Sequence, residues 1–76
     1  MSDCFVSFSS ALEIRDFVSI ASRQYFPIAV ESDNMQADAK SIMSICALGF
    51  DRPLHVRIPE TADGTEFFSA VRSYIK

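Results

Sequence analysis

The sequence predicts a small α+β domain in which helices cover one face of an antiparallel sheet and leave the other face in water. Residues 54–58 alternate apolar and polar side chains, which indicates a strand with one buried and one wetted face. Residues 14–21 and 67–75 carry apolar side chains at helical spacing. A chain of 76 residues has room for one domain with a thin core. The predicted element order is β-α-β-β-α-β-α, with three helices on one face of a four-stranded sheet.

The first strand and the first helix follow from the N-terminal third of the chain. Residues 4–8 are rich in β-branched and aromatic side chains and predict a strand. Ser10, followed three positions later by Glu13, forms the pattern of a capping box, which opens a helix. One face of this helix is apolar and consists of Ile14, Phe17, Val18 and Ala21.

The middle of the chain predicts a hairpin. Pro27 forbids continuation of the first helix, so residues 26–31 are expected to form the second strand with the proline at its start. Residues 32–34 (Ser-Asp-Asn) form a turn cluster, because Asp and Asn bond their own backbone and tolerate positive φ. Residues 35–38 then form a short third strand whose polar character suits a sheet edge.

Two further helices are predicted in the second half of the chain. Ser41 precedes a short apolar helix over residues 42–48, which Gly49 ends in a left-handed conformation. After the strand at 54–58, Asp63 caps a last helix, with Glu66 completing a second capping box. The apolar stripe of that helix consists of Phe67, Phe68, Val71 and Ile75.

Composition excludes several classes of function. The net charge is −3 and the seven Lys and Arg residues are scattered, so an acidic surface would repel nucleic acid. The longest nearly apolar stretch, residues 42–50, is far shorter than the ~20 residues that cross a bilayer. No basic region precedes the N-terminal apolar run, so we expect no signal peptide and a cytoplasmic location.

Cys4 and Cys46 lack CxxC spacing and are expected to be free and partly buried.

No constellation of residues indicates catalysis, a metal or a cofactor. Cys4, Cys46 and His55 match no metal-ligand spacing and no nucleophile–base pattern. Ser10 has no base nearby, and its hydroxyl is expected to be engaged in the cap. We therefore predict that the protein is not an enzyme and acts by contacting other proteins.

The segment 39–50, Ala-Lys-Ser-Ile-Met-Ser-Ile-Cys-Ala-Leu-Gly-Phe, resembles the second-helix motif of HPr. HPr is the small phosphocarrier of the bacterial phosphoenolpyruvate:sugar phosphotransferase system, which serves sugar transport. The resemblance extends over nearly the whole chain, through the apolar face of the first helix, the turn at Asp33 and Asn34, the fourth strand and the last helix. It implies a single HPr-like domain over residues 1–76, with the βαββαβα open-faced β-sandwich of that family.

The chain departs from the HPr pattern at the start of the first helix. HPr carries phosphate there on a histidine, which an arginine and a proline follow. Counting back from Phe17, Ser10 takes the histidine's place, and the preceding loop is shortened. Ala11, Leu12 and Glu13 follow, so the acceptor and the cation are both missing and a negative charge is added. Residue type therefore excludes phosphohistidine transfer at Ser10, a degenerate active-site position.

His55 is the one histidine and could be considered a displaced phosphate acceptor. It lies in the middle of a predicted strand, away from any predicted helix N-terminus. We expect instead a solvated residue on the open face of the sheet.

Ser41 is the candidate for regulatory phosphorylation. In low-GC Gram-positive relatives, the resemblance implies, a dedicated kinase phosphorylates this serine and the product docks to a transcriptional regulator. A phosphate at a helix N-terminus meets free amides and the positive end of the helix dipole, worth about 0.3–1 kcal/mol at a surface. Alternatively Ser41 simply caps its helix, worth about 1 kcal/mol. The two interpretations are compatible.

The resemblance also implies a partner-binding surface at this helix. Ile42, Met43 and Cys46, together with Lys40, would correspond to the exposed docking patch of the family. The alternative is that Ile42 belongs to the core with Ile45 and Leu48, so that only Met43 is exposed.

Two hypotheses of function follow. The first is a regulatory HPr-like protein of the phosphotransferase system that cannot carry phosphohistidine and docks to partners at the Ser41 helix. Its candidate partners are a serine kinase, a transcriptional regulator or phosphotransferase-system components. The alternative is an HPr-fold binding or scaffold module with no role in that system.

Overall fold

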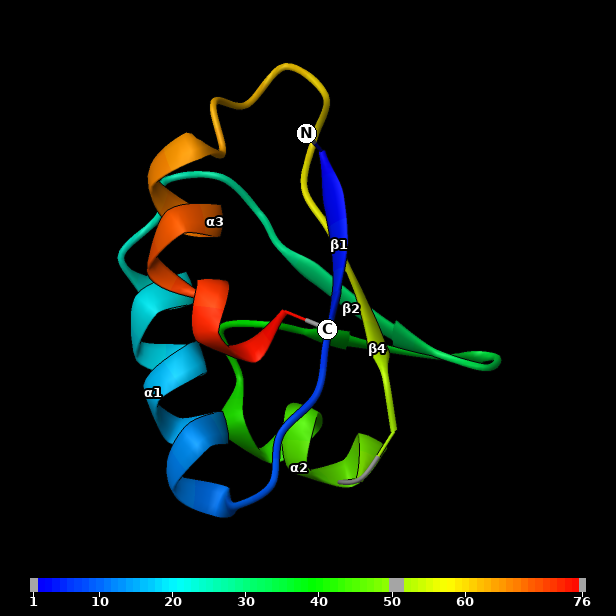
Figure 1. The fold of residues 1–76 in the computed structure, drawn as a ribbon. Helices are drawn as coiled ribbons and strands as arrows, with labels where there is room; N and C mark the ends of the chain where they lie inside the picture. Colours follow the sequence, from blue (N-terminus) through cyan, green and yellow to red (C-terminus); the bar gives the residue numbers. More distant parts are fainter. Residues whose placement is uncertain (1, 50–51, 76) are drawn as a thin grey trace.

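The four predicted strands and three predicted α-helices are present and follow one another in the expected order (Figure 1). The computed structural model describes residues 2–49 and 52–75. The elements are β1 (Asp3–Val6), α1 (Ala11–Ser22), β2 (Ala29–Ser32), β3 (Met35–Asp38), α2 (Ile42–Leu48), β4 (Leu54–Arg57) and α3 (Thr65–Ala70). A 3₁₀ turn, η1 (Arg72–Tyr74), follows the last helix.

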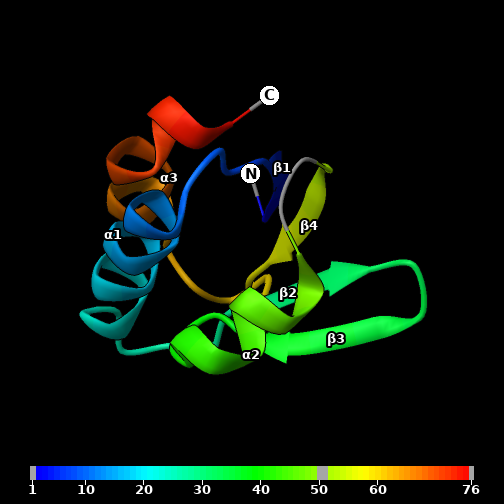
Figure 2. The ribbon, with the colours of Figure 1, turned by 90° about the horizontal axis from the view of Figure 1, so that it is seen from below.

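The strands form one antiparallel sheet in the order β1-β4-β2-β3. The ribbon views show the helices gathered on one side of this sheet (Figures 1 and 2). The predicted fold class is therefore confirmed. In the register, His55 on β4 pairs with Phe5 on β1 and with Glu31 on β2. These three side chains form one row on the open face, because side chains of paired residues point to the same side of a sheet.

The core lies between the helices and the inner face of the sheet. Phe17 on α1 and Phe67 on α3 are fully buried, and their ring centroids lie 6.0 Å apart in an edge-to-face arrangement. The sheet contributes the fully buried side chains of Val6, Val30, Leu54 and Val56. The predicted alternation of residues 54–58 is confirmed, since Leu54, Val56 and Ile58 are buried while Arg57 is exposed.

β4 ends one residue earlier than predicted, at Arg57, whereas β1 and β2 differ more from their predicted bounds because nearby residues pack into the core instead of pairing in the sheet. β1 ends at Val6, and Phe8 turns into the core, where its ring packs edge-on against Phe17 at 5.2 Å. β2 begins at Ala29 and not at residue 26, since Pro27 has no N–H to donate. Phe26 is buried, with its ring centroid 6.5 Å from that of Phe67.

The last helix is shorter than predicted and begins without a reciprocal capping box. Its N-cap is Gly64, and Asp63 supports the first turn by accepting a hydrogen bond from the backbone N–H of Thr65 at 3.1 Å. The bonds to Thr65 lower the pKa of the Asp63 carboxyl. Ile75 lies beyond the helix and forms a β-bridge with Val6.

The thiols and the helix lengths bear on two sequence predictions. Both cysteines are free, as predicted, but they differ in exposure: Cys4 is buried in the core and Cys46 is exposed. Within residues 2–49 and 52–75, no helix has both the length and the apolar character that crossing a membrane requires.

Candidate functional site

Ser41 caps α2. Its backbone is extended, with φ −117° and ψ 108°, and its hydroxyl accepts a hydrogen bond from the Ser44 N–H at 3.4 Å. The predicted cap is therefore confirmed. Gly49 ends the helix with φ 95°, but its ψ of 174° lies outside the left-handed helical region that the sequence predicted.

The exposed apolar surface of α2 includes Ile42, Met43 and Cys46, which together we call the docking patch, and Ala47 is exposed beside them. Met43 is 79% exposed and Ile42 is 39% exposed. Ile45 and Leu48 point into the core. The alternative in which only Met43 is exposed is thus wrong, because the seven-residue helix turns Ile42 outward.

Lys40, which the resemblance placed in the partner-binding surface, makes two contacts within the chain. Its ammonium donates a hydrogen bond to the Gln24 carbonyl at 2.8 Å, just beyond the end of α1. Its backbone N–H donates to Asp38 Oδ1 at 2.9 Å. Lys40 therefore ties the start of α2 to the end of α1, whatever it does toward a partner.

Side chains of Ser10 and Glu13 form hydrogen bonds that cap the start of α1. Ser10 is the N-cap, and its hydroxyl accepts a hydrogen bond from the Glu13 N–H at 3.3 Å. The Glu13 carboxylate accepts a hydrogen bond from the Ser9 N–H at 2.9 Å and another from the Ser9 hydroxyl at 3.2 Å. The capping box is thus formed, but its return bond reaches Ser9 instead of Ser10. An acidic side chain therefore lies in the first turn of α1.

Leu12 lies in the first turn of α1. Its side chain is apolar and 62% exposed. The backbone N–H groups at the first turn remain, but the ionised group in that turn is Glu13 and its charge is negative. The observed contacts at this helix start are those of a helix cap.

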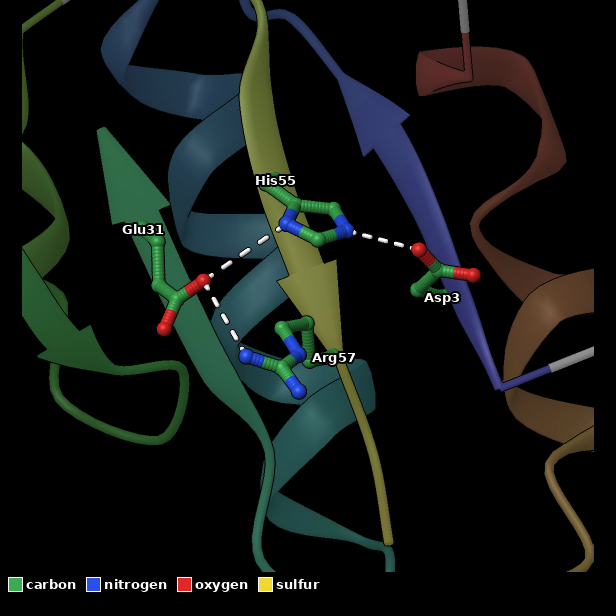
Figure 3. A network of polar contacts seen from close by, with 4 residues as sticks. All are labelled: Asp3, Glu31, His55 and Arg57. Carbon is green, nitrogen blue, oxygen red and sulfur yellow. Dashed lines mark hydrogen bonds and ion pairs between the residues drawn. The ribbon is translucent and has the colours of Figure 1, made fainter. Parts of the chain in front are cut away.

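His55 lies on the open face, as predicted, but it is held between other side chains instead of standing in water (Figure 3). Its Nε2 lies 2.7 Å from Asp3 Oδ2, and its Nδ1 lies 3.5 Å from Glu31 Oε1. The ring stacks on Phe5 with centroids 4.7 Å apart and planes 18° apart. The Nε2 atom of His55 is therefore engaged by Asp3, and Nδ1 faces the Glu31 carboxylate at a longer distance.

Asp3, Glu31, His55 and Arg57 together form what we call the open-face network (Figure 3). Sequence reasoning missed it, because Asp3 and His55 are 52 positions apart and meet only through the pairing of β1 with β4. The alternation of residues 54–58 placed His55 on the correct face. No signal in the sequence indicated the partner strands.

The described part of the chain, residues 2–49 and 52–75, contains no group of three or more His, Cys, Asp or Glu side chains that could hold a metal ion. The buried thiol of Cys4 is also poorly suited to chemistry. Burial, with a smaller contribution from Asp3, raises its pKa to about 11, so the thiol stays protonated.

Two solved structures of HPr proteins have the same fold as this chain. HPr-C-His from Thermoanaerobacter tengcongensis is similar in structure, with a TM-score of 0.77 and 27% sequence identity over 96% of this chain and 89% of that one. The phosphocarrier protein HPr from Bacillus anthracis is also similar, with a TM-score of 0.74 and 28% identity over 97% of this chain and 95% of that one. No protein-family model matches the sequence, and no curated protein matches it.

Proposed function

We propose that this chain is a cytoplasmic regulatory protein of the HPr type, related to the sugar phosphotransferase system. It carries no phosphohistidine and has no enzymatic activity of its own. It acts by docking to other proteins through α2, and phosphorylation of Ser41 controls that docking.

The main support for this proposal is that a half-buried serine caps the same short helix that exposes several apolar side chains. Ser41 stands at the start of α2, and Met43 and Ile42 follow it with 79% and 39% exposure. A phosphate on Ser41 would place about two negative charges beside this docking patch. Such a change alters the affinity of any partner that contacts the patch.

The proposed loss of phosphohistidine is supported by the contacts at the start of α1. Ser10 supplies a hydroxyl in place of an imidazole, and that hydroxyl is occupied by the Glu13 N–H. Phosphohistidine needs a ring nitrogen as acceptor and positive charge around the phosphoryl group. The Glu13 carboxylate brings the opposite charge.

The proposal is tested by incubating the protein with ATP and a serine kinase that phosphorylates HPr. We expect incorporation of one phosphate, located on Ser41 by mass spectrometry, and none in the Ser41→Ala variant. Ser44→Ala is the matched control, because Ser44 contributes its backbone N–H and not its hydroxyl to the cap. That control should be phosphorylated like the unmodified protein.

The outcomes separate the two hypotheses of function. No phosphate in the unmodified protein, with HPr labelled in parallel, would contradict the regulatory proposal and favour an HPr-fold scaffold. A second incubation with phosphoenolpyruvate and the enzyme that phosphorylates HPr on histidine should give no transfer. Transfer in that assay would overturn the proposed loss of the carrier function.

A further inference from the structure

His55 occupies the centre of the open sheet face, with a carboxylate on either side. Its strand, β4, lies between β1, which carries Asp3, and β2, which carries Glu31 (Figure 3). The contact to Asp3 is a hydrogen bond of 2.7 Å, and the contact to Glu31 is longer, at 3.5 Å. The His55 side chain is 28% exposed and Glu31 is 31% exposed, so protons from solvent can reach the site.

The number of protons on the ring decides how many carboxylates it can serve. A neutral imidazole has one N–H donor, whereas an imidazolium has two. The short distance to Asp3 assigns the single proton of the neutral ring to Nε2. In that state Nδ1 directs a lone pair at Glu31, which is repulsive. In the imidazolium both nitrogens donate, and both carboxylates are paired.

Glu31 has a second partner to which it can turn. Arg57 Nη1 lies 3.7 Å from Glu31 Oε1, the same oxygen that faces His55. Both contacts are longer than a good charge-assisted hydrogen bond of about 2.8 Å, so neither is fully formed. The Glu31 carboxylate thus lies between the His55 ring and the Arg57 guanidinium.

The remaining neighbours of His55 among the described residues do not supply a competing charge at Nδ1. Phe5 from β1 stacks on the ring and is uncharged. Gln36 on β3 is the pairing neighbour of Glu31 and is also uncharged. Arg52 and Asp33, which line the same surface hollow, pair with each other at 3.2 Å.

We propose that protonation of His55 Nδ1 is a pH-sensitive switch on the open face of the sheet. In the acidic state a solvent proton binds the Nδ1 lone pair, Nδ1–H donates to Glu31, and β1, β4 and β2 are joined by side chains. In the alkaline state the proton returns to solvent and Glu31 is released toward Arg57. Histidine is the side chain that ordinarily changes charge between about pH 5 and pH 8. The switch is independent of α2 and of Ser41.

The state of the ring and the position of Glu31 are both measurable by NMR. Imidazole ¹⁵N shifts at about pH 8 should identify the neutral ring as the Nε2–H tautomer, and at about pH 5 both nitrogens should carry protons. Three-bond couplings that report the Glu31 χ1 rotamer should change along the same titration curve. In His55→Phe, which keeps an aromatic ring against Phe5, the Glu31 couplings should not change between these pH values.

A matched carboxylate elsewhere in the sheet provides the control. Asp38→Asn on β3 should leave the Glu31 response unchanged, since Asp38 is bonded to the Lys40 backbone and not to His55. The proposal is overturned if the neutral ring carries its proton on Nδ1. It is also overturned if the Glu31 rotamer still changes between about pH 5 and pH 8 in His55→Phe.

Discussion

The Lys40 ammonium donates a hydrogen bond of 2.8 Å to the backbone carbonyl of Gln24, joining the beginning of α2 to the end of α1. The cation also lies beside the negative end of the α1 dipole. We expect Lys40→Met, which keeps the aliphatic stem, to lower the free energy of unfolding by about 1 kcal/mol. A bond to a charged donor is worth about 1.5–3 kcal/mol when buried, and partial solvation reduces this figure.

The measurement is urea-induced unfolding with an unchanged m-value. Arg15→Met is the control, because Arg15 pairs at 3.4 Å with its sequence neighbour Asp16 and both side chains are well exposed. That change should cost less than about 0.5 kcal/mol. If Lys40→Met and Arg15→Met lower the free energy of unfolding equally, the Lys40–Gln24 hydrogen bond makes no specific contribution to stability.

Gly64 is required by close packing at the start of α3. A Cβ at this position would lie 2.3 Å from Ile58 Cδ1 and 2.8 Å from Phe68 Cε2. The Ile58 methyl can move, but the Phe68 ring is held in the core. We expect Gly64→Ala to destabilise the protein by about 1–3 kcal/mol, as overpacking does elsewhere.

Gly49→Ala provides a comparison in which the added methyl group meets no close neighbour, so that only the strain of the positive φ lowers stability. Gly49 has φ 95°, and apart from its chain neighbours no atom of the described residues lies within 4 Å of the place that a Cβ would take. Its replacement is therefore strained only by the positive φ, and we expect a loss of about 1 kcal/mol or more from that source. Adding Ile58→Val to Gly64→Ala should recover part of the stability lost at Gly64. Adding Ile58→Val to Gly49→Ala should recover none of the stability lost at Gly49. If Ile58→Val gives no recovery, the clash with Ile58 is not the cause.

Local patterns predicted the features whose partners lie close in the sequence. The caps at Ser10 and Ser41 were predictable because each hydroxyl bonds an amide three residues ahead. The alternation around Val56 was sufficient to identify the wet and buried faces of β4, since the strand period is two. The apolar spacing of α1 identified Phe17 as a core residue in the same way.

Features that depend on strand pairing or on helix packing were beyond sequence reasoning. The contact between His55 and Asp3 needs the β1–β4 register, and the Lys40–Gln24 bond needs the relative position of two helices. The burial of Phe26 was also missed, because the packing of α1 against α3 and not a strand pattern determines it. Each of these contacts joins residues that no local motif relates.

The two thiols should differ strongly in reactivity. Cys4 is buried with its pKa raised to about 11, whereas Cys46 is exposed on α2. The thiolate is the reactive form, so at about pH 8 a thiol reagent should modify one cysteine rapidly. Cys46→Ser should abolish this fast phase, and Cys4→Ser should leave it unchanged. A fast phase that survives Cys46→Ser would contradict the burial of Cys4.

The raised pKa of Cys4 also predicts a loss of stability in strong alkali. The fold favours the protonated thiol, so its contribution is complete below the unfolded value of 9.0 and is lost as pH rises through about 11. Comparing the unfolding free energy of the unmodified protein and Cys4→Ala across this range isolates the effect. The difference in unfolding free energy between the unmodified protein and Cys4→Ala should become smaller as pH rises. A constant difference would mean that Cys4 titrates no differently when the chain is unfolded.

Ser10 and Glu13 should contribute to stability as a coupled pair. Ser10→Ala removes the acceptor for the Glu13 N–H and should cost about 1 kcal/mol. Ser19→Ala, on the exposed face of α1, is the control and should be neutral or slightly stabilising, because alanine has the higher helix propensity. Loss of stability in Ser19→Ala equal to that in Ser10→Ala would contradict the capping role.

A double-mutant cycle with Glu13→Ala tests whether the two bonds of the cap depend on each other. The Glu13 carboxylate holds the Ser9 N–H at 2.9 Å, directly before the cap residue, and the Ser10 hydroxyl holds the Glu13 backbone. Losing either bond loosens the turn that positions the other, so the sum of the two single effects should exceed the double effect by about 0.5 kcal/mol or more. Strict additivity would mean that Glu13 stabilises α1 through its charge near the helix N-terminus alone, and not through the geometry of the box.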